Sequence, residues 1–308
     1  MKRYLRIMLG AKSVYADECF KGNFIGADFG IDFDLSNQLP DNWREFNQKF
    51  IPIWLMKNEG KSKISAGLAC GALWTISKGI QKGDVVLCPN GTGSYYIGEV
   101  VDNYAFHLNG VLPHRRTVKW YPNTIERSAM SETLRNSTGS IGTVSDITRY
   151  AEEIETLIGG TKPPVIFSND ETIEDITEFA LEKHLEDFLV KNWKQTELGK
   201  HYDIYEEGGE LVGKQYPTDT GPIDILAISK DKKTILVVEL KKGRASDNVV
   251  GQVQRYMGFA LETLAEKNQQ VKGVIIALED DLRIKRALSV TNNIEFYRYK
   301  INFKLFKD

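Results

Sequence analysis

The chain has 308 residues, of which 42% are hydrophobic and 27% charged, with a formal net charge of −2 at pH 7. This length suits two globular domains, and the near-neutral charge means that any contact with nucleic acid must come from local basic patches. The three cysteines lack the paired spacing of a zinc site, and no signal peptide or membrane-length apolar run is present, so we expect a cytoplasmic protein without a membrane partner.

The N-terminal half alternates short strand patterns with glycine-rich turns. Residues 41–56 carry aromatic side chains at helical spacing and then run into a strand pattern, while Asn90-Gly91 is a strong hairpin signal. Residues 127–142 are small and polar and predict a loop, and Ser145 is expected to cap a helix ending at Ile158. The pattern predicts an α+β domain over residues 1–158, built on a small curled sheet or β-barrel.

A hairpin with the sequence GDVVLCP, followed by the strand HRRTVKW, resembles PUA-like modules of the EVE type. The resemblance implies a DNA-recognition domain, because such modules are fused to restriction nucleases and bind a flipped, modified base in an aromatic pocket. The alternative is that these aromatic residues simply fill the core. The aromatic residues available for a pocket are Trp54, Trp74, Tyr95, Tyr96 and Trp120.

The run TKPPVIFSND indicates a linker, which we place at residues 159–170. The domain after it, residues 171–308, begins with an amphipathic helix over Glu174–Asn192 and continues with strands, a helix and further strands. This order predicts an α/β domain in which helices flank a mixed sheet. An alternating pattern from Ile294 to Phe306 predicts the last strand.

Two acidic residues interrupt apolar strands in this second domain. Asp224 lies within one strand, and Glu239 and Lys241 emerge on the same face of the next, with Leu240 pointing away. Two carboxylates from adjacent strands and the Leu240 carbonyl would suffice for a hard cation such as Mg²⁺ or Mn²⁺, with Lys241 beside the attacking water. The alternative is an ordinary salt bridge between Glu239 and a neighbouring lysine.

The spaced pattern GPID, VVELK and GQVQRY resembles the PD-(D/E)xK nuclease superfamily, and within it the NucS (EndoMS) endonucleases. The resemblance implies a metal-dependent endonuclease whose catalytic residues fall on Asp224, Glu239 and Lys241. It also implies that Gln252 and Tyr256 face the metal from one side of a helix. The first helix of that family contributes a Glu, which falls on Glu186, with Glu182 as second choice.

Two basic groups are candidates for DNA phosphate contacts, with solvated surface charge as the alternative. One belongs to the N-terminal domain, and the other borders the predicted metal site. They are Arg115, Arg116 and Lys119 in the first group and Lys242 and Arg244 in the second.

Our leading expectation is a restriction-type DNA endonuclease that acts in defence and whose N-terminal domain selects the DNA. A NucS-like mismatch or branched-DNA endonuclease, or a non-cleaving nucleic-acid reader, are the alternatives. One site makes one cut, so cutting both strands would need a homodimer.

Overall fold

The computed structural model describes residues 2–139, 142–159, 185–207, 209–280 and 282–300, apart from the side chain of Arg244. The chain divides into two compact units, residues 1–170 and 171–308. The predicted linker after residue 159, the predicted helix before residue 185 and the end of the last predicted strand lie outside the described residues. Within the described residues, no helix is long and apolar enough to cross a membrane.

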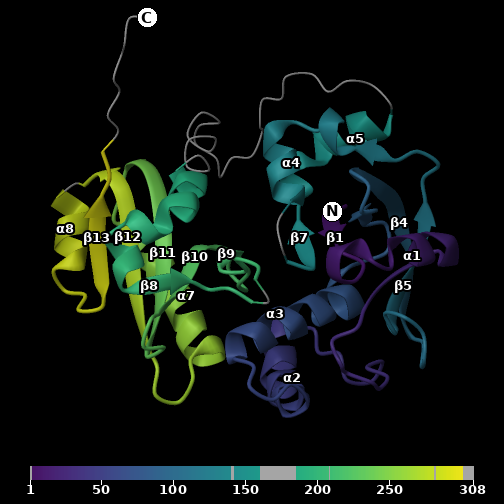
Figure 1. Ribbon diagram of the computed structural model, residues 1–308, viewed down its shortest axis with the longest axis horizontal. Coiled ribbons are helices and arrows are strands. Elements are labelled where there is room, and N and C mark those ends of the chain that lie inside the picture. Colours follow the sequence, from purple (N-terminus) through teal and green to yellow (C-terminus); the bar gives the residue numbers. More distant parts are fainter. Residues whose placement is uncertain (1, 140–141, 160–184, 208, 281, 301–308) are drawn as a thin grey trace, which may run out of the picture. The chain divides into compact units, whose positions relative to one another are not determined.

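The first unit contains one mixed sheet (Figure 1). Its strands are β1 (Tyr4–Ile7), β2 (Phe24–Ala27), β3 (Val85–Pro89), β4 (Ser94–Phe106), β5 (His114–Trp120), β6 (Ile125–Glu126) and β7 (Val144–Asp146). Their order is β2-β5-β4-β3-β1-β7, with β6 paired to β4, and only β1 and β3 run parallel to each other. The outer strands β2 and β7 do not pair with each other among the described residues, so this sheet is open and the predicted barrel is wrong.

Helices of the first unit depart from the predicted pattern in three places. Residues 41–56 do not run into a strand, because one helix continues through Pro52. The segment 127–142 contains a helix that begins after Ser131, whose side chain accepts a hydrogen bond from the Leu134 amide. Ser145 lies in β7 and caps no helix. The helices are α1 (Ala16–Gly22), α2 (Trp43–Lys57), α3 (Lys63–Trp74), α4 (Glu132–Thr138) and α5 (Ala151–Ile158).

Both faces of the first sheet are covered. Alternation along β3 directs Val86 and Cys88 into one apolar cluster and Val85 and Leu87 into another. A strand that is buried on both faces explains the continuous apolar run that the sequence shows here. The three cysteines are buried free thiols, as the sequence predicts.

The second unit contains a mixed sheet of the predicted kind. Its strands are β8 (Tyr202–Ile204), β9 (Lys214–Tyr216), β10 (Ile223–Ser229), β11 (Thr234–Arg244), β12 (Gln270–Glu279) and β13 (Ile294–Arg298). The order is β13-β12-β11-β10-β8, with β9 also paired to β10. The strands β11, β12 and β13 are parallel, and β10 is antiparallel to its neighbours β11, β8 and β9.

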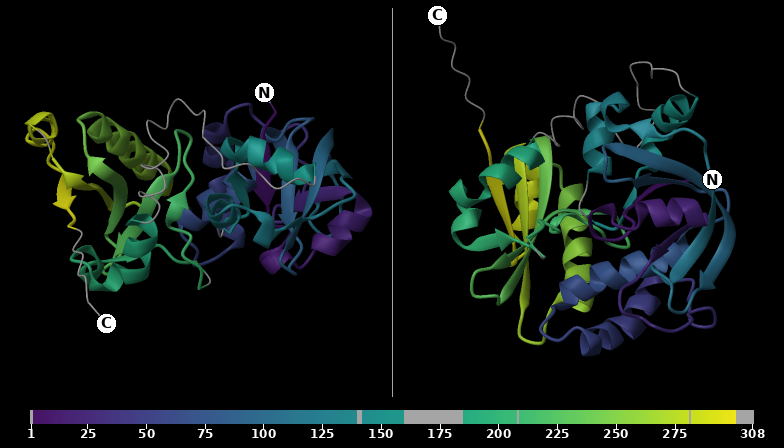
Figure 2. Two further views of the ribbon diagram at one scale, coloured as in Figure 1. Left: turned by 90° about the horizontal axis from the view of Figure 1, so that it is seen from above. Right: turned by 45° about the vertical axis from the view of Figure 1, so that its right-hand side comes forward.

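Helical segments cover this sheet on both faces. The helix α7 (Asn248–Phe259) packs on β11 and β12, and the segment 185–200 packs on the opposite face (Figure 2). The approach of α7 requires a glycine at position 273, because a Cβ there would lie 2.5 Å from Val253 and 2.7 Å from Met257. A further helix, α8 (Leu282–Leu288), follows β12.

Candidate active site

Asp224 and Glu239 lie side by side on the face of the sheet that α7 covers. The register between β10 and β11 pairs Ile225 with Val238, so the next residues outward, Asp224 and Glu239, stand opposite each other. Opposite residues of an antiparallel pair share a face and bring their Cβ atoms within about 5 Å. The structure therefore places the two acids on one side of the sheet, as strand alternation predicts.

Local hydrogen bonds fix both carboxylates. Asp224 Oδ2 accepts a hydrogen bond of 2.8 Å from the backbone amide of Leu240. Lys241 Nζ lies 3.1 Å from Glu239 Oε1, which makes an ion pair between residues two apart on the strand. Glu239 is only 2% exposed, whereas Asp224 and Lys241 are partly exposed. The salt bridge that we considered as the simpler alternative is thus present, and it lies beside a second carboxylate.

The electrostatics of Asp224 favour a positive charge at this place. Loss of hydration on burial raises the pKa of Asp224 well above its usual range, and the charges of Glu239 and Glu186 raise it further. The hydrogen bond from the Leu240 amide and the charge of Lys241 lower that pKa in part. Two mutually repelling carboxylates fit a hard divalent cation, which takes oxygen ligands, keeps several waters and offsets the negative charge of the pair.

Glu186 reaches Asp224 through a glutamine. Gln215 Nε2 donates to Glu186 Oε1 at 2.5 Å and to Asp224 Oδ1 at 3.1 Å, and Glu186 is 5% exposed. The described part of the chain holds no group of three or more His, Cys, Asp or Glu residues able to hold a metal ion. A cation here would therefore depend on Asp224, Glu239 and donors such as the Leu240 carbonyl. Sequence reasoning missed Gln215, because only its strand pairing shows that it faces Asp224.

The two predicted residues of α7 also come together. Gln252 Nε2 donates to the hydroxyl of Tyr256 at 3.3 Å. Burial raises the pKa of Tyr256, its hydrogen bond with Gln252 lowers that pKa, and the charges of Glu239 and Asp224 raise it. A Cβ at Gly221 would lie 3.0 Å from the Tyr256 hydroxyl, and Gly221 has φ +117°, so a glycine is required there.

The predicted basic group of the N-terminal half is divided, because backbone carbonyls hold two of its side chains and the third is exposed. Arg116 is 4% exposed, and its guanidinium donates to the carbonyls of Asp102 and Ile80, so the prediction that it contacts phosphate is wrong. Arg115 is partly buried, donates to two backbone carbonyls and lies 3.7 Å from the Phe24 ring centroid. Lys119 is exposed and Lys242 half-buried, and for both, as for Arg244, a phosphate contact stays a prediction.

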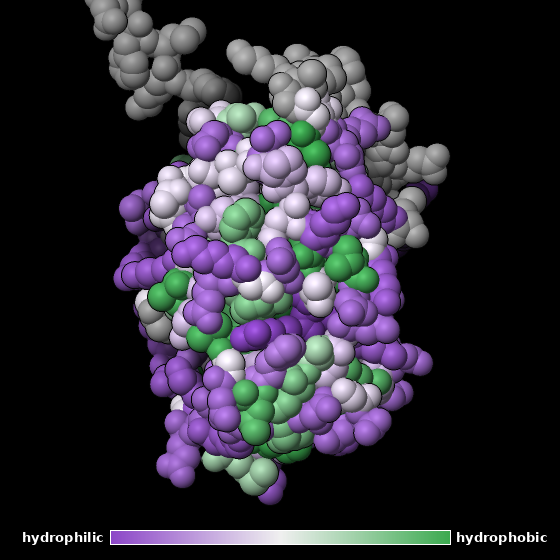
Figure 3. Space-filling model, turned by 90° about the vertical axis from the view of Figure 1, so that its right-hand side faces the viewer, coloured by the Kyte–Doolittle hydropathy of each residue, from purple (hydrophilic) through white to green (hydrophobic). Residues whose placement is uncertain are grey.

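The predicted aromatic pocket is divided between core and surface. Trp54 and Tyr95 belong to the buried clusters, so the prediction that they line a base pocket is wrong. Trp74 packs at the edge of the core and donates to the carbonyl of Pro40. On the face shown in Figure 3, hydrophobic side chains form separate patches among hydrophilic ones.

Tyr96 and Trp120 do meet, but they form a packed cluster. Phe20 stacks on Tyr96 with ring centroids 4.2 Å apart, and its centroid lies 5.6 Å from that of Trp120. The hydroxyl of Tyr96 donates to Asp17 at 2.7 Å. Because the Tyr96 and Phe20 rings stack on each other, this arrangement is not an open cage for a base.

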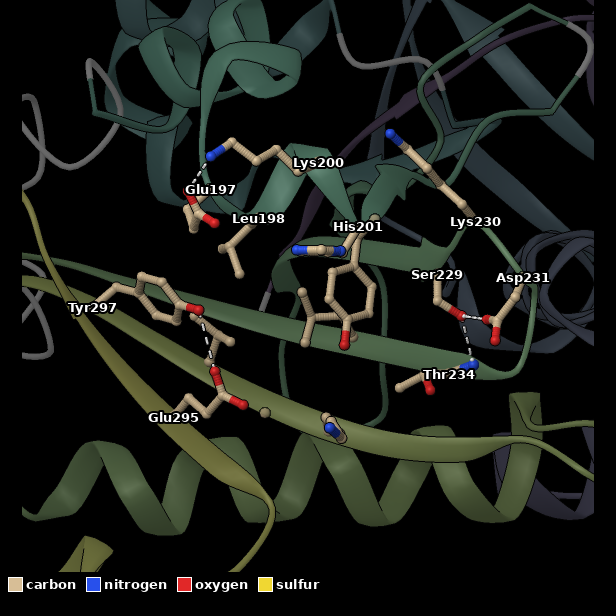
Figure 4. A pocket seen from close by; sticks show the side chains of 15 residues that line it. Glu197, Leu198, Lys200, His201, Ser229, Lys230, Asp231, Thr234, Glu295 and Tyr297 are labelled. Atoms are coloured by element: carbon tan, nitrogen blue, oxygen red, sulfur yellow. Dashed lines mark hydrogen bonds and ion pairs between the residues drawn. The ribbon is translucent and has the colours of Figure 1, made fainter.

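A separate hollow of about 580 Å³ lies on the opposite face of the second sheet (Figure 4). Leu236, Lys272 and Val274 line it, and they point away from Asp224 and Glu239 because the alternation of the strands separates the two sets. Within the hollow, Glu197 forms an ion pair with Lys200 at 2.6 Å, and Asp231 accepts a hydrogen bond of 2.6 Å from the Ser229 hydroxyl. This hollow therefore takes no part in the candidate active site.

Two family models match the sequence. Residues 182–302 match the family described as Endonuclease NucS C-terminal domain, and residues 6–148 match a domain of unknown function (DUF8426). The NucS resemblance of the second domain is thereby confirmed, whereas the PUA-like resemblance of the first is not.

Curated relatives match over the same region. Endonuclease NucS of Methanocaldococcus jannaschii is 26% identical over 147 residues, which cover 48% of this chain and 51% of that protein. Endonuclease NucS of Corynebacterium efficiens is 37% identical over 90 residues, which cover 29% of this chain and 37% of that protein. The matched region thus spans about half or less of these relatives.

Two solved structures show a distant likeness. The structure of an EndoMS–dsDNA2 complex has 14% sequence identity and a TM-score of 0.32, covering 68% of this chain and 62% of that one. The crystal structure of a repair endonuclease from Pyrococcus abyssi has 16% identity and a TM-score of 0.31, covering 69% and 66%. Likenesses this distant add nothing to the argument from the sequence matches and the site.

Proposed function

Residues 182–302 form a domain of the NucS C-terminal type, and from this premise we propose that the protein is a metal-dependent DNA endonuclease. The observation that carries the proposal is the placement of Asp224, Glu239 and Lys241 together on one face of the sheet. The relatives matched by sequence are NucS endonucleases, which favours a mismatch or branched-DNA substrate over the restriction and defence role.

The proposed metal is Mg²⁺ or Mn²⁺, held by the carboxylates of Asp224 and Glu239 and the carbonyl of Leu240. Such an ion lowers the pKa of bound water and stabilises negative charge on phosphate oxygens. Lys241 supplies a positive charge 3.1 Å from Glu239, where it can orient the attacking water and offset charge on the phosphate. Tyr256 and Gln252 belong to α7, which packs on the strand of Glu239, and their proposed role is to help exclude bulk water from the metal site.

A cleavage assay with matched duplexes tests this proposal. The substrates are an unmodified duplex, a duplex with one G·T mismatch, a branched duplex and a duplex with hydroxymethylated cytosine. We expect Mg²⁺- or Mn²⁺-dependent cutting that EDTA abolishes, with preference for the mismatched or branched duplex. If only the duplex with hydroxymethylated cytosine is cut, the result would contradict this proposal and support a restriction-type endonuclease instead.

Two variants assign the cutting to this site. Lys241→Ala removes the amine beside Glu239 and is expected to lower the cleavage rate by roughly 10²–10⁴-fold. Lys272→Ala is the matched control, because Lys272 is a half-buried lysine on the opposite face of the same sheet. Equal activity of the Lys241→Ala variant and the wild type would refute the assignment.

A further inference from the structure

Gln215 stands directly opposite Asp224 in the sheet. The register between β9 and β10 pairs Tyr216 with Ile223 and Lys214 with Ile225, which leaves Gln215 facing Asp224. Asp224 therefore has Glu239 on one side and Gln215 on the other, all on one face of the sheet. Its two oxygens are each held by one donor, Oδ1 by the Gln215 amide and Oδ2 by the Leu240 amide.

The backbone at Gln215 is unusual for a residue in a strand. Its φ is +51°, in the left-handed region that side chains other than glycine seldom adopt. The chain is fixed on both sides: Gly213 pairs through its backbone with Tyr205 and Leu226, and Tyr216 is buried. Strained backbone of this kind persists where the surrounding structure imposes it, and it is concentrated at functional sites.

The left-handed turn lets two consecutive side chains reach the same acid. Lys214 Nζ lies 3.3 Å from Glu186 Oε2, while Gln215 Nε2 lies 2.5 Å from Glu186 Oε1. In a regular strand, neighbouring side chains point to opposite faces and could not share a partner. Glu186 is thus held in place from two sides, and Gln215 links it to Asp224.

We infer that Gln215 is a positioning residue that fixes the orientation of the Asp224 carboxylate and couples it to Glu186. This inference rests on the proposed function, since it concerns the same metal site. Its amide nitrogen carries two hydrogens and no charge, so it satisfies one oxygen of each acid and holds the two acids apart without competing as a cation. Removing it frees Asp224 Oδ1 to rotate, which weakens metal binding while the fold remains intact.

Calorimetric titration of the full chain with MnCl₂ tests the inference. Gln215→Gly removes the amide and relieves the left-handed backbone, and Gln215→Leu removes the amide but keeps most of the volume. We expect both variants to unfold in one cooperative thermal transition in EDTA, as the wild type does, and to bind Mn²⁺ about 10–100-fold more weakly than the wild type. Lys232→Gly is the matched control, because Lys232 also has a positive φ, of 60°, in the turn between β10 and β11, far along the strand from Asp224.

Each outcome separates this inference from the proposed function. If both Gln215 variants bind Mn²⁺ as the wild type does, while Asp224→Asn does not bind it, the inference is overturned and the proposed function stands. Weak binding by Gln215→Gly alone would assign the effect to the backbone and overturn the role of the side chain. If Asp224→Asn binds Mn²⁺ like the wild type, the metal site fails, and the proposed function fails with it.

Discussion

Replacing Asp224 with Asn is expected to stabilise the metal-free protein while it abolishes catalysis. The substitution removes one of two negative groups that stand opposite each other on β10 and β11. Asn keeps one oxygen, which can accept the hydrogen bond from the Leu240 amide, but its amide nitrogen then faces the Gln215 amide, which keeps Glu186 as its only acceptor of the two acids. The net effect on the free energy of unfolding is then the lost repulsion from Glu239 less the lost hydrogen bond from Gln215.

The size of this effect follows from Coulomb's law. Two unit charges about 5 Å apart repel by about 3 kcal/mol at an effective dielectric constant of about 20. Lys241, 3.1 Å from Glu239, cancels part of this repulsion, and the raised pKa of Asp224 reduces its charge. We therefore expect the free energy of unfolding to rise by about 1–2 kcal/mol in EDTA, which corresponds to a few °C for a domain of this size.

Thermal unfolding with and without Mn²⁺ measures the effect. At a free Mn²⁺ concentration of about 100 times its Kd, binding stabilises the wild type by about 2.7 kcal/mol, whereas Asp224→Asn gains nothing. The order of the two melting temperatures should thus reverse between EDTA and Mn²⁺. Asp203→Asn, at an exposed position on β8, is the control and should show no reversal. A variant less stable than the wild type in EDTA would refute the reasoning.

Gly221→Ala should lower the free energy of unfolding of the second unit by about 1–3 kcal/mol, because φ is +117° and the added Cβ would lie 3.0 Å from the Tyr256 hydroxyl. A thermal unfolding curve equal to that of the wild type would contradict this. Arg116→Leu should lower the melting temperature of the first unit and leave the DNA affinity of the folded protein unchanged, since the guanidinium donates to buried carbonyls; a selective loss of DNA affinity would argue against the structural role. Burial lowers the pKa of His114 below 6.5, so the unfolded state binds the proton more readily, and the stability of the first unit should decline as pH falls below about 6.5. Thermal melts from pH 7.5 to 5.5 measure this decline, and the control variant His107→Gln, at an exposed position, should show the same decline as the wild type. A wild-type melting temperature that does not change over this pH range would rule out a buried neutral imidazole at His114.

The arrangement of Asp224, Glu239 and Lys241 could be predicted because it depends on local rules. Strand alternation puts residues 239 and 241 on one face, and a short turn between two strands sets which residues stand opposite. The register found in the structure agrees with both rules. The mixed sheet of the second unit was predictable for the same reason, since apolar runs and turns mark its strands.

The role of Gln215 could not be predicted, because it depends on contacts between distant segments. Its left-handed backbone follows from how Gly213 and Tyr216 are fixed by other strands, and no pattern in the sequence near position 215 shows this. The need for glycine at position 221 likewise depends on Tyr256, which is 35 positions later in the sequence.

The first unit was harder to predict because charge and aromaticity do not reveal burial. Arg116 alternates inward along β5, where backbone carbonyls accept its hydrogen bonds, yet in the sequence it belongs to a dense basic cluster. The indole ring of Trp54 is of a kind that can stack on a base, but Trp54 lies on the buried side of α2. Such residues are told apart only by which face of each element meets the core.

Crystals of the protein soaked in MnCl₂ and measured at the manganese absorption edge would test the central claim most directly. The account predicts an anomalous density peak bounded by the carboxylates of Asp224 and Glu239, and its loss in Asp224→Asn crystals. An anomalous peak elsewhere in the chain would contradict the claim. The absence of any peak, although the dissolved protein cuts DNA in the same buffer, would contradict it too.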